Sequence, residues 1–232
     1  MPTASAVPGG NNRALALAST SPRRRELLTL TGAMFTVVSA PAPPGGEAPR
    51  PDEAPESFVQ RVSRDKAQAA ASRLPPSAPM LVVAADTVVA IDGCILGKPA
   101  DNDEAIEILK LLRGRVHTVW TAVTVLDVAA GRELIDIART DVPMRSYDDD
   151  EIAAYVSTGD PLDKAGAYAI QHAGFHPVDG LSGCYANVMG LPLCHLTRTL
   201  RRAEADLPAN VPSACQSHTG YHCPVYQGIL EG

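Results

Sequence analysis

Apolar residues follow two periods along this chain, and each period predicts a different kind of element. Continuous or alternating apolar runs predict strands, whereas apolar residues three or four apart predict helices. The longest apolar run is MLVVAADTVVAI, at 80–91. The predicted strands are 13–18, 35–38, 80–91, 94–98, 116–128, 133–142 and one near 164–171. The predicted helices are 22–31, 55–72, 102–113, 149–157 and a last helix that begins at 191.

Turn residues indicate how these strands are joined. Asp92-Gly93 is a typical hairpin pair, and Ala130-Gly131 lies between two long apolar runs. Hairpins within an alternation of helices and strands favour a mixed sheet over a purely parallel one. The sequence therefore predicts an α/β fold with a mixed sheet flanked by helices.

Three stretches differ from this pattern. Residues 1–12 have no apolar periodicity and are predicted to be a disordered N-terminus. The segment 39–56 carries six prolines and is predicted to be a loop. Apolar residues become scarce from Leu207 onward, so 207–232 is predicted to be a disordered tail. These boundaries leave one domain over 13–206.

Composition narrows the class of protein and of partner. The chain has 232 residues, of which 45% are hydrophobic, and this is enough for a substantial core. A net charge of −6 argues against a nucleic-acid partner and favours a small ligand. No apolar run is long enough to span a membrane, and no signal-peptide core precedes the first strand. Five cysteines without framework spacing fit a reducing compartment, so a cytoplasmic location is expected.

The stretch LALASTSPRRRELL, at 15–28, combines a strand end, a hydroxyl-rich loop and a helix start. Ser21 is a good helix N-cap and Pro22 suits the first helical position. Arg23, Arg24 and Arg25 follow, although a helix first turn favours acidic residues. This arrangement is typical of a phosphate-binding site. A solvated basic helix start is the alternative interpretation.

Other side chains in unusual settings are candidates for chemistry. Asp86 interrupts an apolar run, where a carboxylate is costly without a cation, a metal or hydrogen-bond donors. It is a candidate general base or metal ligand, or a carboxylate bound to a backbone turn. Lys66 and Lys98 are candidate phosphate ligands, or ordinary surface lysines. Gln171 ends the small-residue segment 164–171 and can both donate to and accept from a nucleobase.

Six motifs in order resemble the Maf family of nucleoside triphosphate pyrophosphatases: LASTSPRRRELL, VVAADTVV, LGKP, HTVWTAVTV, DKAGAYAIQ and NVMGLP. The resemblance covers roughly 15–200. It implies two lobes about an elongated mixed sheet, as in the inosine triphosphate pyrophosphatases, with a nucleotide in the cleft between the lobes. It also implies cleavage of the α–β phosphate bond with a divalent metal ion, Mg²⁺ or Mn²⁺. A homodimer is usual for the family.

The resemblance assigns roles to residues of this chain. Asp86 matches the proton acceptor, which can also hold the metal. The matches for substrate binding are Ser19, Ser21, Arg23, Arg24, Lys66 and Lys98. The acidic pair that many relatives carry is replaced here by the proline-rich loop, so Glu47 or Glu53 is the candidate second metal ligand.

Three positions divide the family by substrate. This chain has Arg23, Thr87 and Gln171 there, which resembles the dTTP/UTP pyrophosphatase class. The class acting on 7-methyl-GTP tends to carry Trp, Gln and Glu instead. Pyrimidine triphosphates are therefore the expected substrates, with modified pyrimidine triphosphates included and 7-methyl-GTP as the alternative.

Two further alternatives concern function and the tail. Family members have been tied to septum formation and cell division arrest, so a nucleotide-binding regulator with little turnover is a second hypothesis. In the tail, Cys215, His218, His222 and Cys223 suggest zinc by their chemistry. The adjacent His222-Cys223 pair is poor spacing for one tetrahedral site, so the disordered tail is favoured.

Overall fold

A computed structural model describes residues 13–39 and 46–232 of the chain, and these build one mixed six-stranded sheet. The strand order is β2-β1-β3-β5-β6, with β4 paired to β3. β1 pairs with β2 and β3 in parallel, and the other pairings are antiparallel. The strands are β1 (Ala14–Leu17), β2 (Phe35–Val37), β3 (Met80–Ile91), β4 (Cys94–Leu96), β5 (Val116–Asp127) and β6 (Arg132–Pro143). The predicted α/β class with a mixed sheet is confirmed.

β3 is paired along most of its length on one side, but only near its two ends on the other. β5 pairs with it from Leu81 to Ala90. On the other side, β1 pairs with Met80 to Val83 and β4 pairs with Val89 to Ile91. Among the described residues, no strand pairs with 84–88 on that side, so the sheet has a notch there. We call this gap the β3 notch.

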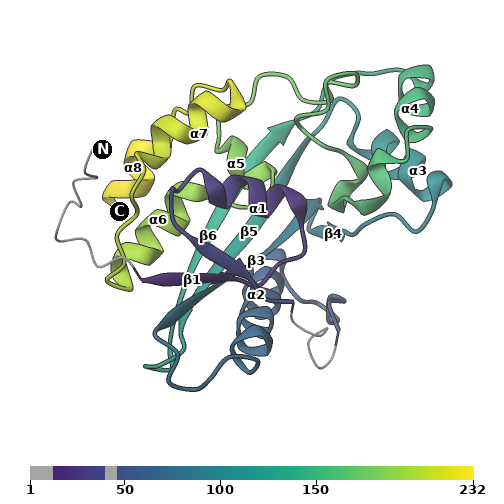
Figure 1. Cartoon of the computed structure of the whole chain (residues 1–232). Coiled ribbons are helices and arrows are strands. Elements are labelled where there is room, and N and C mark those ends of the chain that lie inside the picture. The colour runs from purple at the N-terminus through teal and green to yellow at the C-terminus, as the bar shows by residue number, and fades with distance from the viewer. Residues whose placement is uncertain (1–12, 40–45) are drawn as a thin grey trace.

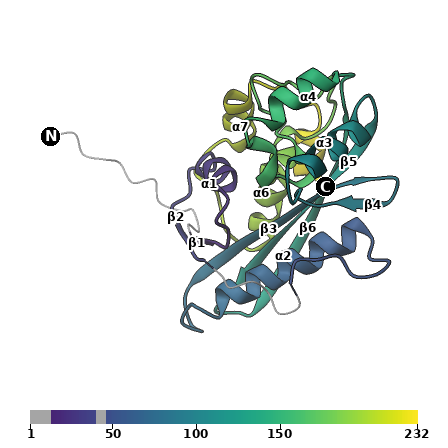
Figure 2. The same cartoon turned by 90° about the vertical axis from the view of Figure 1, so that its right-hand side faces the viewer.

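One face of the sheet is covered by a single long helix. α2 (Pro55–Ala71) begins at Pro55, which suits a first helical turn. Its alanines Ala67 and Ala70 pack on Val82 and Ala84 of β3. Figure 2 shows α2 lying along this face, apart from the other helices.

The opposite face carries two separate buried clusters along β3. Leu81, Val83 and Ala85 pack with leucines of α1 (Pro22–Thr29) and α6 (Leu193–Arg202). Val89 and Ile91 pack with α3 (Asn102–Leu112) and α4 (Asp149–Val156). Figure 1 shows these two groups of helices at opposite ends of the long strands. This arrangement agrees with the expectation of two lobes about an elongated sheet.

The predicted strand near 164–171 is wrong. Two short 3-10 helices, η1 (Asp160–Asp163) and η2 (Ala165–Ala167), stand in its place. Gly166 has a φ of +71°, and a Cβ there would come within 2.7 Å of Val89. The glycine and alanines serve close packing against β3 rather than strand pairing, and α5 (Tyr185–Val188) follows further along.

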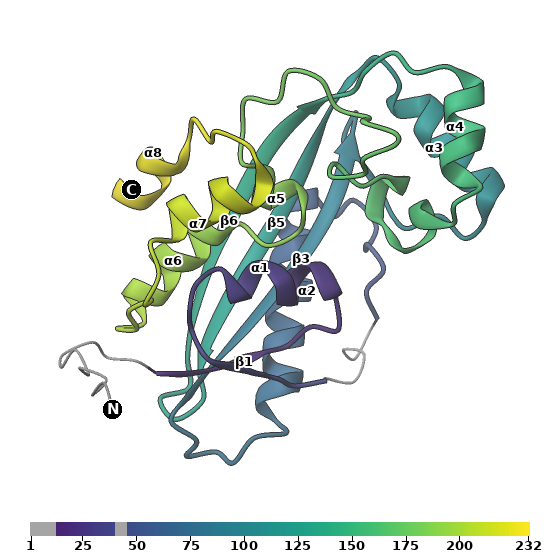
Figure 3. The ribbon, with the colours of Figure 1, turned by 45° about the horizontal axis from the view of Figure 1, so that its top comes forward.

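The prediction of a disordered tail at 207–232 is also wrong. The segment forms α7 (Val211–Thr219) and α8 (Tyr226–Glu231), which lie beside α6 in Figure 3. Val211 is buried, and Leu207, Cys215 and Val225 pack against the α1–α6 cluster. A few well-placed apolar residues suffice because the domain provides the rest of the core. The predicted N-terminal disorder, at 1–12, lies outside the described residues. No helix in the described part of the chain is both long and apolar enough to cross a membrane.

Candidate functional site

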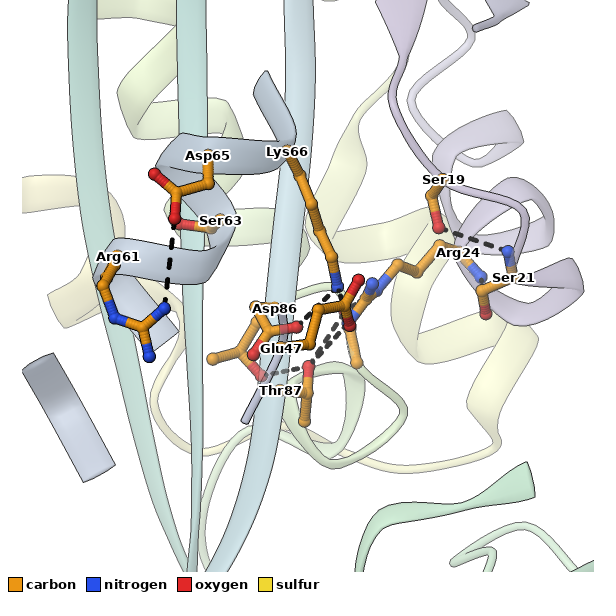
Figure 4. Close-up of polar contacts among 12 residues, drawn as sticks. Ser19, Ser21, Arg24, Glu47, Arg61, Ser63, Asp65, Lys66, Asp86 and Thr87 are labelled. Carbon is orange, nitrogen blue, oxygen red and sulfur yellow. Dashed lines mark hydrogen bonds and ion pairs between the residues drawn. The ribbon is translucent and has the colours of Figure 1, made fainter. Parts of the chain in front are cut away.

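Asp86 and Thr87 lie side by side on β3, at the β3 notch. Because successive side chains on a strand point to opposite faces, Asp86 lies on the α2 face and Thr87 on the α1 face. Asp86 is only 7% exposed, although it is a carboxylate. Figure 4 shows side chains from both faces of the sheet gathered here, with Lys66 at Asp86 and Arg24 at Thr87.

The hydroxyl-rich loop between β1 and α1 is shaped by local hydrogen bonds. Ser19 Oγ accepts from the Ser21 backbone N–H at 3.2 Å. Ser21 Oγ accepts from the Arg24 N–H at 3.5 Å and caps α1. These serines form an ordered turn that leads into the N-terminus of α1, which is the local structure expected of a phosphate loop. Its role with a ligand stays a prediction.

Arg24 connects the phosphate loop to β3. Its Nε donates to the Gly190 carbonyl at 2.8 Å, and its Nη2 donates to Thr87 Oγ1 at 3.0 Å. Burial lowers the pKa of Arg24, and the nearby Asp86 charge opposes that effect. Gly190 has a φ of +104°, which disfavours other residues at this point of contact.

Lys66 lies between two carboxylates. Its Nζ is 2.8 Å from Asp86 Oδ1 and 2.8 Å from Glu47 Oε2. Burial raises the pKa of Asp86, while Lys66 and Arg24 oppose the rise and Glu47 adds to it. The group is close to charge balance, with two cations facing two acids. A polyanionic ligand that binds here would compete with the carboxylates for contact with the two cationic side chains.

The structure separates the two candidates for a second metal ligand. Glu53 receives two hydrogen bonds of 2.7 Å from Arg61, which holds the pKa of Glu53 at about 2. Glu47 instead shares the Lys66 ammonium with Asp86. Two carboxylates meeting at one cation fit the donor chemistry of Mg²⁺, which uses one or two carboxylates together with substrate phosphates. Glu47, not Glu53, is the second candidate ligand.

Zinc finds no support in the tail. His222 Nδ1 is 2.9 Å from Gln216 Oε1, and His218 pairs with Glu26 at 3.5 Å. These contacts turn the histidines toward different neighbours. Within 13–39 and 46–232, no group of three or more His, Cys, Asp or Glu side chains is arranged to hold a metal ion.

The remaining predicted residues make no hydrogen bond to Asp86 in the described structure. Lys98 is exposed, next to Gly97, whose carbonyl accepts from the Gly166 N–H at 3.0 Å. Gln171 is exposed on a turn that follows η2. Arg23 is partly buried in the first turn of α1. The substrate roles of Arg23, Lys98 and Gln171 stay predictions.

Sequence reasoning did not single out two residues that contact Arg24 or its partner Thr87. Thr121 on β5 is fully buried and its Oγ1 lies 2.9 Å from Thr87 Oγ1. The Gly190 carbonyl accepts from Arg24. Thr121 belongs to an ordinary alternating strand pattern, which does not mark it as a site residue. Gly190, before Leu191-Pro192, can be recognised in the sequence only as a loop residue.

A third overlooked residue, Lys164, is 6% exposed and belongs to the DKAGAYAIQ motif. Its Nζ contacts Asp160 Oδ1 at 2.8 Å and Asp163 Oδ1 at 2.6 Å. A lysine beside two aspartates in a small-residue segment is a visible signal of an ion pair, here one in which the lysine alone is buried. This network anchors the start of the segment that carries Gln171.

Comparisons with known proteins agree with the resemblance of the motifs. The chain is 43% identical to the dTTP/UTP pyrophosphatase of Pelotomaculum thermopropionicum over 191 residues, 81% of this chain and 95% of that protein. It is 45% identical to the protein of the same name from Geobacter metallireducens over 190 residues, 82% and 96% of the two chains. The protein of that name from Bordetella parapertussis is 44% identical over 199 residues, 84% and 94%.

Among solved structures, the nucleoside-triphosphatase / dITP/XTP pyrophosphatase from Mycobacterium abscessus matches with a TM-score of 0.37 and 16% identity. That match covers 72% of this chain and 85% of the other. The family model described as Maf-like protein matches residues 14–203, from β1 to the end of α6. This chain belongs to the Maf family.

Proposed function

We propose that this chain is a nucleoside triphosphate pyrophosphatase that hydrolyses dTTP and UTP to the nucleoside monophosphate and pyrophosphate. The observation that carries the proposal is the meeting of Arg24, Lys66 and Asp86 at the β3 notch. It is supported by relatives of that name that are 43–45% identical over more than four fifths of the chain.

The cations supply the binding energy for the triphosphate. A nucleoside triphosphate carries about four negative charges near neutral pH, and Arg24, Lys66 and the α1 N-terminus offer matching positive charge. The same groups stabilise the charge that grows on the leaving pyrophosphate. Lys98, exposed just after β4, adds a further cation in this proposal.

Asp86 acts as the general base. It deprotonates or orients the water that attacks the α-phosphorus, and it passes the proton on after the bond breaks. Burial raises the pKa of this carboxyl and so strengthens it as a base, while the charges of Lys66 and Arg24 oppose that rise. When phosphate draws Lys66 away, the carboxylate becomes free to take a proton.

Asp86 and Glu47 would hold a divalent cation, Mg²⁺ or Mn²⁺. The chemistry that such an ion supplies is neutralisation of phosphate charge in the transition state. Both carboxylates contact Lys66 Nζ in this structure, so Lys66 would share their oxygen atoms with such an ion.

Base selection falls to Arg23, Thr87 and Gln171. Uracil and thymine present two carbonyl acceptors on either side of one N–H donor. A glutamine amide can donate to one carbonyl and accept from that N–H, which a glutamate cannot do because it only accepts. The competing substrate, 7-methyl-GTP, offers adjacent donors and suits a carboxylate better. We further propose a cytoplasmic location and a homodimer, and a mass measurement in solution tests the homodimer.

Product analysis with UTP, dTTP, CTP and 7-methyl-GTP, with and without Mg²⁺, tests the proposal. The expected products from UTP are UMP and pyrophosphate, with turnover dependent on the metal ion. Release of inorganic phosphate would show cleavage at another bond. Tight nucleotide binding with no turnover would instead favour the regulator hypothesis, and preference for 7-methyl-GTP would favour the other substrate class.

A further inference from the structure

No strand pairs with the segment from η1 to Gln171 in the described structure, although Gly166 packs against β3. Its conformation depends on individual hydrogen bonds. Lys164 binds the Asp160 carbonyl at 2.6 Å and both nearby carboxylates. Gly166 N–H binds the Gly97 carbonyl. These contacts fix the beginning of the segment, but they do not reach Gln171.

Gln171 lies inside a tight turn. The His172 N–H donates to the Ala169 carbonyl at 3.1 Å, which closes a β-turn with Ile170 and Gln171 at its centre. His172 then fixes the following chain, because its Nδ1 accepts from the Gly174 and Phe175 N–H groups at 3.3 and 3.1 Å. The backbone conformation at Gln171, from which its side chain departs, is therefore set by the two ends of this turn, Ala169 and His172.

Tyr155, from α4, contacts both ends of that turn. Its hydroxyl accepts from the Ala169 N–H at 3.0 Å. Its ring meets the His172 ring edge-on at 4.7 Å between centroids. The same ring stacks on Phe175 at 4.3 Å, so it is itself held in place. Tyr155 is 3% exposed and lies 14 residues before Ala169 in the sequence.

The hydroxyl of Tyr155 makes two hydrogen bonds, one as acceptor and one as donor. It accepts from Ala169 and donates to Asp160 Oδ2 at 2.7 Å. Asp160 in turn is fixed by Lys164. The chain of contacts runs from the Lys164 ammonium through Asp160 and Tyr155 to Ala169, two residues before Gln171. A phenyl ring alone would leave the buried Ala169 N–H without its acceptor.

We propose that Tyr155 is a positioning residue for base selection, which holds the Ala169–His172 turn so that Gln171 is presented to the pyrimidine. This inference rests on the proposed function. Burial raises the pKa of Tyr155 far above its ordinary value, so the hydroxyl stays protonated and keeps its donor role. The positive charge of Arg23 acts in the opposite direction on that pKa, which places another specificity position within electrostatic reach of Tyr155.

The test compares Tyr155→Phe with Tyr147→Phe. Tyr147 is a second buried tyrosine of the same cluster, and its hydroxyl donates to the Leu109 carbonyl at 2.8 Å, away from the turn. We measure kcat and KM for UTP and CTP, since cytosine carries a donor where uracil carries an acceptor. In Tyr155→Phe, the KM for UTP is expected to rise about tenfold with kcat nearly unchanged, and discrimination against CTP to fall similarly. Tyr147→Phe is expected to keep the wild-type discrimination.

A double-mutant cycle with Gln171→Ala adds a readout that a merely structural role would not produce. If Tyr155 acts through Gln171, Tyr155→Phe causes no further loss of discrimination in the Gln171→Ala background. Additive effects would overturn the proposal. Asp160→Ala, which removes the acceptor of the Tyr155 hydrogen, is a second variant expected to shift discrimination the same way if Tyr155→Phe folds poorly.

The outcomes separate this inference from the function on which it rests. Absence of UTP turnover in the wild-type protein would overturn the proposed function. Normal UTP turnover with unchanged UTP/CTP discrimination in Tyr155→Phe would overturn only the inference. Equal loss in Tyr155→Phe and Tyr147→Phe would do the same, because it would trace the effect to the core rather than to the turn.

Discussion

Lys66 Nζ lies 2.8 Å from Asp86 Oδ1, so the candidate general base is paired with a candidate phosphate ligand. The pair comes from α2 and β3, which pack directly on each other. The pairing holds the ammonium and the carboxylate at the β3 notch, where both are partly removed from solvent and each neutralises the charge of the other. It also links their functions, because any change at one alters the charge felt by the other.

Asp86→Asn removes the base and most of the affinity for a metal ion while keeping the side-chain size. Pyrophosphate release is expected to fall by at least roughly 10²-fold. Folding is expected to survive, because a buried amide is less costly to desolvate than a carboxylate. Steady-state turnover and a melting curve check both points. Asp65→Asn, on the same helix as Lys66 but paired with Arg61, is the matched control. Near-normal turnover in Asp86→Asn would contradict the assignment.

Glu47→Gln is expected to shift the acid limb of the pH–kcat profile. Glu47 contributes to the raised pKa of Asp86, after burial, through charge repulsion. Removing that charge lowers the pKa of Asp86, so activity is retained to lower pH than in the wild-type protein. The acid limb is therefore expected to move down, and the apparent affinity for Mg²⁺ to weaken. An acid limb that moves up would show that Glu47 does not act on Asp86 in this way.

Arg24→Ala is expected to raise the KM for every triphosphate alike, because phosphate contacts do not read the base. Loss of a charge-assisted contact typically amounts to about 1.5–3 kcal/mol, or roughly 10- to 150-fold. KM values for UTP, dTTP, CTP and 7-methyl-GTP check this. Arg73→Ala, at an exposed arginine just after α2, controls for the loss of positive charge. An effect confined to one nucleobase would remove Arg24 from the phosphate site.

Gln171→Glu is expected to lower kcat/KM for UTP and dTTP while 7-methyl-GTP loses less or gains. A carboxylate facing a pyrimidine carbonyl leaves an unmatched polar pair, which typically costs about 1–3 kcal/mol, or roughly 5- to 150-fold. The measurement is kcat/KM for the four triphosphates in both proteins. Equal losses for all four would mean that Gln171 does not read the base.

Deletion of 207–232 is expected to lower thermal stability. α7 and α8 cover part of the α1–α6 cluster, with Val211 buried and Leu207 packed beside it. Exposing that area is expected to lower the melting temperature by at least about 3 °C. Deletion of Glu231 and Gly232 alone, both exposed, is the control. An unchanged melting temperature would show that the two helices add no stability.

Strong local patterns predicted much of the fold. The apolar run at 80–91 gave β3 its observed bounds, and Pro55 marked the start of α2. Asp86 was identifiable because a carboxylate in such a run needs a partner, and Lys66 is that partner. The motif residues Arg24 and Thr87 are hydrogen-bonded to each other. The sequence could place them on neighbouring elements, but it could not predict their contact.

The failures have physical reasons. The small residues near Gly166 resembled a strand, yet they permit close packing against Val89. The tail seemed too poor in apolar residues to fold, but it needs only to complete a core that the domain already supplies. Tyr155 left no signal in the sequence because it touches the Ala169–His172 turn only through tertiary packing.

The alternation of Asp86 and Thr87 on β3 has a consequence for how the chain tolerates changes in length. Since neighbouring residues of a strand face opposite ways, inserting or deleting one residue between Met80 and Asp86 would exchange their faces. The acid would then point toward Arg24 and the hydroxyl toward Lys66, with the composition of the site unchanged. Such insertions or deletions in β3 are expected to abolish turnover of the nucleotide. The same changes in the loop between β2 and α2 leave the alternation of β3 intact.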